Sequence, residues 1–233
     1  MKNYRSELTV IFEQLSQNLD ITEAQFKAAI RSYQAIEAWL TNPDSPLYGY
    51  QVTIYPQGSL LLGTIIQAIN DEDDLDLDLV CKLERKPILW TQKHTKDAVG
   101  NRIKAHGTYA RMIEDLDGGR RCWTLKYAEE SNFHMDILPA VANEQFAGAL
   151  ETRFFSDTTL MSDLAIRITD KLEKGYSSDP VTLNWLKSNP FGYAQWFYQR
   201  AMTDLSTQMS LKGLIDPERE FQKDGRLFVR AWI

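Results

Sequence analysis

The stretch from Tyr55 to Cys81 constrains this chain more than any other part of it. It begins with a Gly-Ser pair and ends with aspartates that alternate with leucines, at Asp74, Asp76 and Asp78. Because successive side chains of a strand point to opposite faces, the three aspartates share one face and the leucines share the other. Neighbouring carboxylates repel each other unless a cation lies between them, and a hard divalent ion prefers oxygen ligands. The pattern predicts a Mg²⁺ site for phosphoryl or nucleotidyl transfer.

The Gly-Ser pair lies between an expected strand, residues 51–55, and an expected short helix, residues 60–66. Backbone N–H groups are free at the start of a helix, and they suit a phosphate group. Gly58 stands at this turn, and Ser59 adds a hydroxyl to it. The strand–turn–helix unit therefore predicts a phosphate-binding turn. A simple helix cap is the alternative role for Ser59.

A third carboxylate, Asp136, lies in an otherwise apolar strand predicted over residues 132–141. A buried carboxylate without a partner is costly, so Asp136 needs either a cation or contact with solvent. If its strand lies beside that of Asp76 and Asp78, the three carboxylates can hold two Mg²⁺ ions. A solvated acidic strand edge is the alternative reading. By strict alternation His134 shares the face of Asp136.

The remaining pattern predicts an α/β (α+β) fold, with a mixed, strongly twisted sheet flanked by helices. Apolar residues at helical spacing predict two helices within residues 1–45, which we expect to pack on a core formed by residues 46–233. Besides the segments above, the pattern predicts strands at 75–83, 121–127 and 164–168, a helical stretch at 93–116 interrupted near Gly100 and Gly107, and a helix from 190 to about 209.

The composition is that of a soluble globular protein, with 43% hydrophobic and 25% charged residues. A net charge of −6 argues against a broad nucleic-acid-binding surface. Cys81 and Cys122 are expected to be free buried thiols, which suits a reducing compartment. The N-terminus lacks the apolar core of a signal peptide, and no apolar run approaches the length of a membrane span. A cytoplasmic location is expected.

Four segments taken together resemble the cGAS/DncV-like nucleotidyltransferases of the polymerase-β-type superfamily. They are Gln57-Gly58-Ser59, Gly63-Thr64, the run from Asp76 to Cys81 and the run from Phe133 to Ala140. A fifth segment that begins at Ser188-Asn189-Pro190 is also similar, so that the resemblance spans roughly residues 50–200. These bacterial enzymes make cyclic oligonucleotide signals from nucleoside triphosphates in anti-phage defence. The resemblance implies attack of a ribose hydroxyl on an α-phosphorus, with pyrophosphate as the leaving group.

The resemblance also implies roles for individual residues. Asp76 and Asp78 would be the paired metal ligands and Asp136 the third carboxylate, with two Mg²⁺ ions, or Mn²⁺ in their place. Gly58 and Ser59 would hold the triphosphate. Tyr193 is a candidate for stacking on a base, although aromatic residues at helical spacing more often belong to a core. Residues that can offer positive charge to phosphates are Arg120, Arg121, Lys126 and Lys171.

The expected partners are nucleoside triphosphates as substrates and the activating or effector proteins of a defence operon. No membrane partner is expected, and nucleic acid is disfavoured. In the family a second, helical lobe follows the core, and this chain reaches Ile233 about where that lobe begins, on an apolar run. A truncated core is therefore expected. Two alternatives stay open: a nucleotidyltransferase that acts on RNA or protein, and an inactive nucleotide-binding module.

Overall fold

The computed structural model describes residues 4–68, 70, 74–127, 133–143 and 165–201. Within them lies one mixed sheet of six strands, in which β1, β2, β4, β5 and β6 follow one another and β3 pairs with β4. Only β2 and β4 are parallel to each other; the other paired strands are antiparallel. The strands are β1 (Val52–Pro56), β2 (Leu75–Leu83), β3 (Trp123–Tyr127), β4 (Phe133–Ala142), β5 (Ile166–Ile168) and β6 (Leu186–Ser188).

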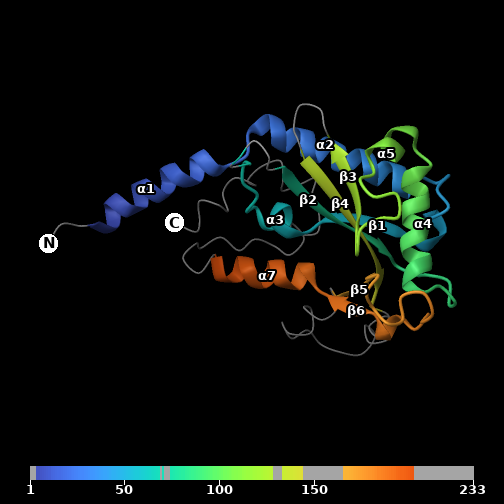
Figure 1. Ribbon diagram of the computed structural model, residues 1–233. Coiled ribbons are helices and arrows are strands. Elements are labelled where there is room, and N and C mark those ends of the chain that lie inside the picture. Colours follow the sequence, from blue (N-terminus) through green and yellow to red (C-terminus); the bar gives the residue numbers. More distant parts are fainter. Residues whose placement is uncertain (1–3, 69, 71–73, 128–132, 144–164, 202–233) are drawn as a thin grey trace.

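Alternation along the central strands gives the sheet one apolar, buried face and one face that is polar near the starts of β2 and β4. The other half of this second face carries a smaller apolar cluster, with Val80, Leu138 and Ala140 at its centre. On β2 the odd-numbered residues from Leu75 to Leu83 are buried, and Met135 and Ile137 on β4 are fully buried on the same face. This face packs against helices gathered on one side of the sheet (Figure 1). They are α2 (Glu23–Thr41), α4 (Gln92–Lys104) and α5 (Gly107–Met112). The expected mixed, helix-flanked sheet is confirmed.

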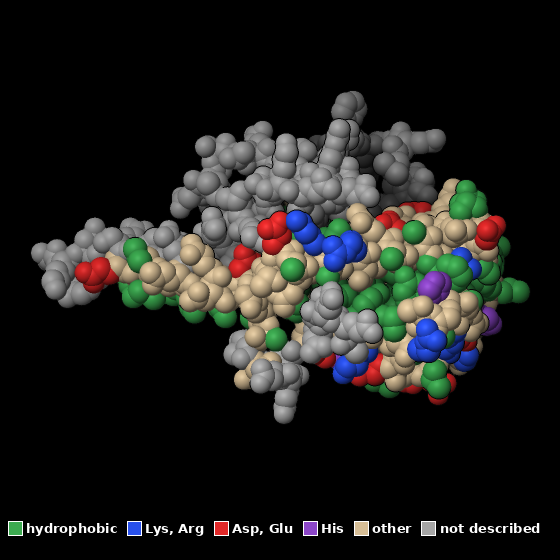
Figure 2. Space-filling model, turned by 90° about the horizontal axis from the view of Figure 1, so that it is seen from above, with side chains coloured by type: hydrophobic (Ala, Val, Ile, Leu, Met, Phe, Trp, Pro, Cys, Tyr) green, Lys and Arg blue, Asp and Glu red, His purple; other side chains and the backbone are tan. Residues whose placement is uncertain are grey.

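The two N-terminal helices differ in how they meet this core. α2 begins with a capping box, in which the Thr22 hydroxyl accepts a hydrogen bond from the Gln25 N–H at 3.2 Å. Its buried Tyr33 donates to the carbonyl of Ile54 on β1 at 3.2 Å. α1 (Tyr4–Leu19) extends beyond the body of the molecule and exposes apolar side chains along its length (Figures 1 and 2). The division into 1–45 and 46–233 stays a prediction.

Several element boundaries differ from those expected. The helical pattern over residues 93–116 is interrupted near Gly107 as expected, because His106 leaves the helical conformation and accepts a hydrogen bond from the Tyr109 N–H at the start of α5. The interruption expected near Gly100 is not found, since α4 continues through this residue. α3 (Gly58–Leu62) is shorter than predicted and ends at Gly63, whose φ of 66° is left-handed. The predicted end of the last helix, near residue 209, lies outside the described residues. The short strand β6 and two 3₁₀ turns, Tyr48–Tyr50 and Thr182–Asn184, were not predicted.

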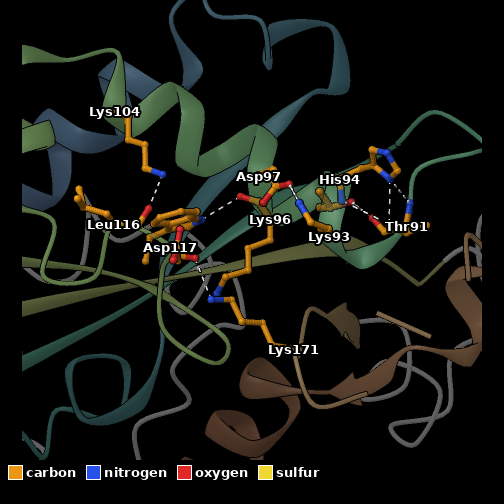
Figure 3. Close-up of polar contacts among 11 residues, drawn as sticks. Thr91, Lys93, His94, Lys96, Asp97, Lys104, Leu116, Asp117 and Lys171 are labelled. Carbon is orange, nitrogen blue, oxygen red and sulfur yellow. Dashed lines mark hydrogen bonds and ion pairs between the residues drawn. The ribbon is translucent and has the colours of Figure 1, made fainter. Parts of the chain in front are cut away.

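Three lysines hold the loop that leads into β3 (Figure 3). Lys96, almost fully buried on α4, donates to the carbonyl of Gly119 at 2.8 Å. Lys104 and Lys171 donate to main-chain carbonyls of residues 116–118. Burial lowers the pKa of Lys96 to about 8. These contacts fix the point at which β3 enters the sheet.

A buried carboxylate, Asp170, ties the turn after β5 to the same region. Its oxygens accept hydrogen bonds from Arg120 Nε at 2.8 Å and Arg121 Nε at 2.7 Å, and from the Leu172 N–H at 3.0 Å. Burial by itself raises the pKa of Asp170, but these donors and the arginine charge outweigh that effect and hold the pKa well below its usual range. Arg120 and Arg121 therefore have a structural role, which is to bind Asp170.

Asp170→Asn is expected to lower the free energy of unfolding at pH 7 by roughly 2 kcal/mol, less than for a fully buried pair because both arginines are about half-exposed. Since the folded-state pKa is depressed, the carboxylate stabilises the fold above its unfolded-state pKa of about 3.9 and ceases to do so as pH falls through the folded pKa. Urea unfolding should show a gap between wild type and variant that narrows below pH 4. The exposed Asp117→Asn is the control, and equal losses in both variants would contradict the assignment.

Candidate active site

On the polar face of the sheet, β2, β4 and β3 place their side chains in rows that cross the strands. The parallel register sets Asp78 opposite Asp136, and the antiparallel register sets Thr124 opposite Asp136 on the other side of β4. The neighbouring row, one step toward the start of β2, holds Asp76, His134 and Lys126. The structure therefore brings Asp78 and Asp136 together on adjacent strands, with Asp76 beside them on the same face.

The electrostatics of this face favour a bound cation. Burial, followed by the charges of Asp136 and Asp76, raises the pKa of Asp78. The charged form of Asp78 is thus disfavoured when nothing neutralises the pair. The Thr124 hydroxyl donates to Asp136 Oδ1 at 2.5 Å. A divalent ion between the two carboxylates would relieve their repulsion.

The donor set fits Mg²⁺ or Mn²⁺, which prefer carboxylate oxygens in a partly hydrated site. Asp76 is exposed and lies two residues from Asp78, which on a strand corresponds to about 7 Å. Within the described residues, no three Asp, Glu, His or Cys side chains converge closely enough to hold one ion. The structure therefore offers a carboxylate pair with Asp76 beside it. The assignment of two ions to Asp76, Asp78 and Asp136 stays a prediction.

Asp74 belongs to a separate ion-pair cluster at the start of β2. Its Oδ2 lies 3.4 Å from His134 Nε2 and 3.7 Å from Lys126 Nζ. His134 lies on the face that alternation predicts for it. Since two basic side chains already surround Asp74, it acts as a flanking charge next to the carboxylate pair.

The turn before α3 lies directly against Asp78. The Gln57 N–H donates to the Asp78 carbonyl at 2.8 Å, and a Cβ placed on Gly58 would lie 2.2 Å from Asp78 Oδ2. Gly58 has a left-handed φ of 59°, which glycine adopts without strain. Ser59 lies inside α3, after the N-cap Gln57, and its hydroxyl makes no hydrogen bond within the described residues. Its alternative role as the helix cap is not observed.

Tyr193 lies apart from the carboxylates, on α7 (Pro190–Ala201). Asn189 Oδ1 accepts a hydrogen bond from the Gly192 N–H at the start of this helix, at 2.8 Å. The ring of Phe191 packs on Tyr55 of β1, with 4.4 Å between centroids. Tyr193 is 53% exposed and contacts Trp196, with 5.6 Å between ring centroids. Its role in base stacking stays a prediction.

The structure separates the basic residues that were candidates for phosphate contacts. Arg120 and Arg121 bind Asp170, and Lys171 binds main-chain carbonyls. Lys126 alone among the four lies on the carboxylate face. Sequence reasoning did not single out Thr124, although alternation within residues 123–127 places Thr124 and Lys126 on one face. Among the described helices none has the length and hydropathy needed to span a membrane.

Comparison with known proteins gives a family and several relatives. A family model described as Second Messenger Oligonucleotide or Dinucleotide Synthetase domain (SMODS) matches residues 7–154. A c-di-GMP synthase of Roseivirga ehrenbergii is 24% identical over 195 residues, which cover 84% of this chain and 44% of that protein. The cyclic dinucleotide synthase CdnG of Bradyrhizobium diazoefficiens is 22% identical over 203 residues, 86% of this chain and 42% of that protein. The chain spans less than half the length of either relative.

The solved structures share the fold. The CD-NTase CdnG of Bradyrhizobium diazoefficiens in complex with GTP superimposes with a TM-score of 0.57 and 19% identity, covering 83% of this chain and 48% of that one. At this identity the match shows the architecture alone. It agrees with the polymerase-β-like core that the sequence predicts.

Proposed function

Because this chain belongs to the SMODS family of second messenger oligonucleotide or dinucleotide synthetases, we propose that it is a nucleotidyltransferase that joins nucleoside triphosphates into a cyclic oligonucleotide. The observation that carries the proposal is the Asp78–Asp136 pair on adjacent strands, against which the glycine of the Gly58-Ser59 turn packs directly. Both relatives are named as synthases of cyclic dinucleotides, which supports the same reaction class.

The residues of this face suit in-line attack of a ribose hydroxyl on an α-phosphorus. Asp78 and Asp136, with Asp76 beside them, would hold Mg²⁺; the bound ion supplies positive charge to the phosphates and lowers the pKa of the attacking hydroxyl. Gly58 and Ser59 offer N–H groups and a hydroxyl to the triphosphate at the start of α3. Each new phosphodiester bond forms as the bond to pyrophosphate breaks, and the last step of this kind closes the ring. Most of the rate enhancement comes from positioning and charge stabilisation.

The finer assignments rest on the family resemblance and the chemistry of the site. We propose Tyr193 as a base-stacking residue, because its ring is exposed on the helix that packs against α3. We also propose that the product is a signal in anti-phage defence, read by an effector protein, and that the enzyme acts in the cytoplasm. The net charge of −6 favours nucleotides over long nucleic acids as substrates.

The test is to incubate the protein with radiolabelled ATP and GTP, separately and mixed, with Mg²⁺ and again with EDTA. A phosphatase-resistant small product, identified by chromatography and mass spectrometry, is the expected result. It should be absent with EDTA and with the Asp76→Ala/Asp78→Ala variant. Label transferred to RNA or protein would instead indicate a macromolecular acceptor. Nucleotide and Mg²⁺ binding in calorimetry without any pyrophosphate release would indicate an inactive binding module.

A further inference from the structure

Thr124 stands at the end of the polar row that contains the carboxylate pair. β3 pairs with β4 so that Thr124 lies opposite Asp136, on the side of β4 away from Asp78. Its hydroxyl donates to Asp136 Oδ1 at 2.5 Å, the short distance of a charge-assisted O–H···O⁻ hydrogen bond. Within the described residues the Asp136 side chain makes no other hydrogen bond. One neighbouring hydroxyl therefore fixes the direction of this carboxylate.

We propose that Thr124 is a positioning residue, whose hydroxyl holds Asp136 Oδ1 and so keeps this carboxylate in the orientation in which it and Asp78 would bind a divalent cation. This inference rests on the proposed function. The terminal torsion of an aspartate is broad, so a carboxylate without a fixed partner samples many directions. Threonine, in contrast, is stiff at χ1 because it is branched at Cβ. The strand thus supplies a rigid donor to a flexible ligand.

The repulsion between the Asp78 and Asp136 carboxylates explains why Asp136 needs the hydrogen bond from Thr124. Asp78 and Asp136 are direct neighbours across β2 and β4, and an untethered Asp136 would turn away from the charge of Asp78. The Thr124 hydroxyl offsets part of the negative charge on Asp136 Oδ1 and keeps the side chain in place. Thr124 is half-buried, so water competes with it less than at an exposed position.

A purely structural role for Thr124 makes a different prediction. In that case the hydroxyl only satisfies a half-buried carboxylate, and removing it lowers stability without changing affinity for the ion. If Thr124 orients a metal ligand, its loss weakens metal binding by the 10- to 100-fold that is typical of groups that hold metal ligands in place. Metal affinity therefore separates the two roles.

The experiment measures Mn²⁺ binding to the full chain by electron paramagnetic resonance, with and without a non-hydrolysable triphosphate analogue. Thr124→Val keeps the shape of the side chain and removes the hydroxyl, and it should weaken Mn²⁺ binding at least about 10-fold. Thr124→Ser keeps the hydroxyl and should bind within about threefold of wild type. Thr53→Val, the same change at an exposed position of β1 opposite Lys82, is the matched control and should bind as wild type does.

A kinetic measurement complements the binding data. In Thr124→Val the Mg²⁺ concentration for half-maximal rate should rise about 10-fold, with the KM for the nucleotide unchanged when Mg²⁺ is saturating. Thermal melting of each variant shows whether it is folded. If Thr124→Val does not fold, Thr124→Ala compared with Thr124→Ser makes the same test.

The outcomes can be told apart. Wild-type Mn²⁺ affinity in Thr124→Val, whatever its melting temperature, would overturn the role of Thr124 while leaving the proposed function intact. Weak binding in Thr124→Ser as well as in Thr124→Val would overturn the role of the hydroxyl. If the wild-type protein binds no Mn²⁺ with nucleotide present, both the proposed metal site and the proposed function are contradicted.

Discussion

Asp136→Asn is expected to reduce the initial rate of product formation by about 10³-fold or more in saturating Mg²⁺. The amide keeps the size of the side chain and removes its charge, so the pair can no longer anchor a divalent ion. Such an ion contributes several kcal/mol of charge stabilisation in the transition state, and each 1.36 kcal/mol corresponds to a factor of ten. Asp78→Asn should have a similar effect, because Asp78 lies directly opposite Asp136.

The stability of Asp78→Asn provides the companion measurement. Because the folded-state pKa of Asp78 is raised, its ionisation opposes folding. The penalty is absent below the unfolded-state pKa of about 3.9, where the carboxyl is protonated in both states, and it appears as pH rises through the folded pKa. Metal-free Asp78→Asn should therefore melt a few degrees above wild type at pH 7, with the difference vanishing near pH 3. An inactive variant that is less stable at pH 7 would point to misfolding.

The exposed Asp117→Asn is the control for both measurements and should behave as wild type in each. Retention of full activity in Asp136→Asn would contradict the carboxylate pair as the centre of the reaction. Loss of activity in Asp117→Asn as well would show that the assay responds to general changes of charge.

Gly58→Ala is expected to reduce the rate by about 10²-fold while the protein stays folded. A Cβ at this position would lie 2.2 Å from Asp78 Oδ2, so either the carboxylate or the turn must move. The φ of 59° adds a strain of roughly 1 kcal/mol for alanine. A displacement of about 1 Å at a reacting centre can cost 10²-fold in rate. Initial rates and thermal melting of the same preparations would test this.

Gly107→Ala is the matched control for Gly58→Ala. A Cβ at Gly107 has no heavy atom within 4 Å, and its φ is not left-handed. Its activity should equal that of wild type. If Gly58→Ala also keeps wild-type activity, the close packing of the turn on Asp78 has no part in the reaction.

Alternation made the carboxylate face predictable, whereas strand register did not follow from the sequence. The leucines of β2 and the apolar residues of β4 fix which face each aspartate occupies. That Asp78 faces Asp136, with Asp76 one row away, depends on the parallel register between strands far apart in the chain. Thr124 could not be predicted for the same reason, because its position opposite Asp136 depends on the register between β3 and β4.

Positive charge alone did not show which residues are available to contact phosphates. Arg120 and Arg121 look like free cations in the sequence, but their partner Asp170 is about fifty residues further along. The break before α5 lies at the interruption expected near Gly107, whereas α4 continues through Gly100, because glycine inside a helix lowers its stability without ending it. Local signals such as the Thr22 capping box were reliable, since all of their partners lie within one helical turn.

The position of β4 links the assembly of the site to the folding of the whole domain. β4 pairs with β2 along one edge and with β3 and β5 along the other. The contact between Asp78 and Asp136 closes a long loop, and contacts of this kind form late because the entropy of loop closure must be overcome first. A chain in which β2 and β4 are not yet paired would lack the carboxylate pair. The proposed activity would then be possible only after the central sheet is complete.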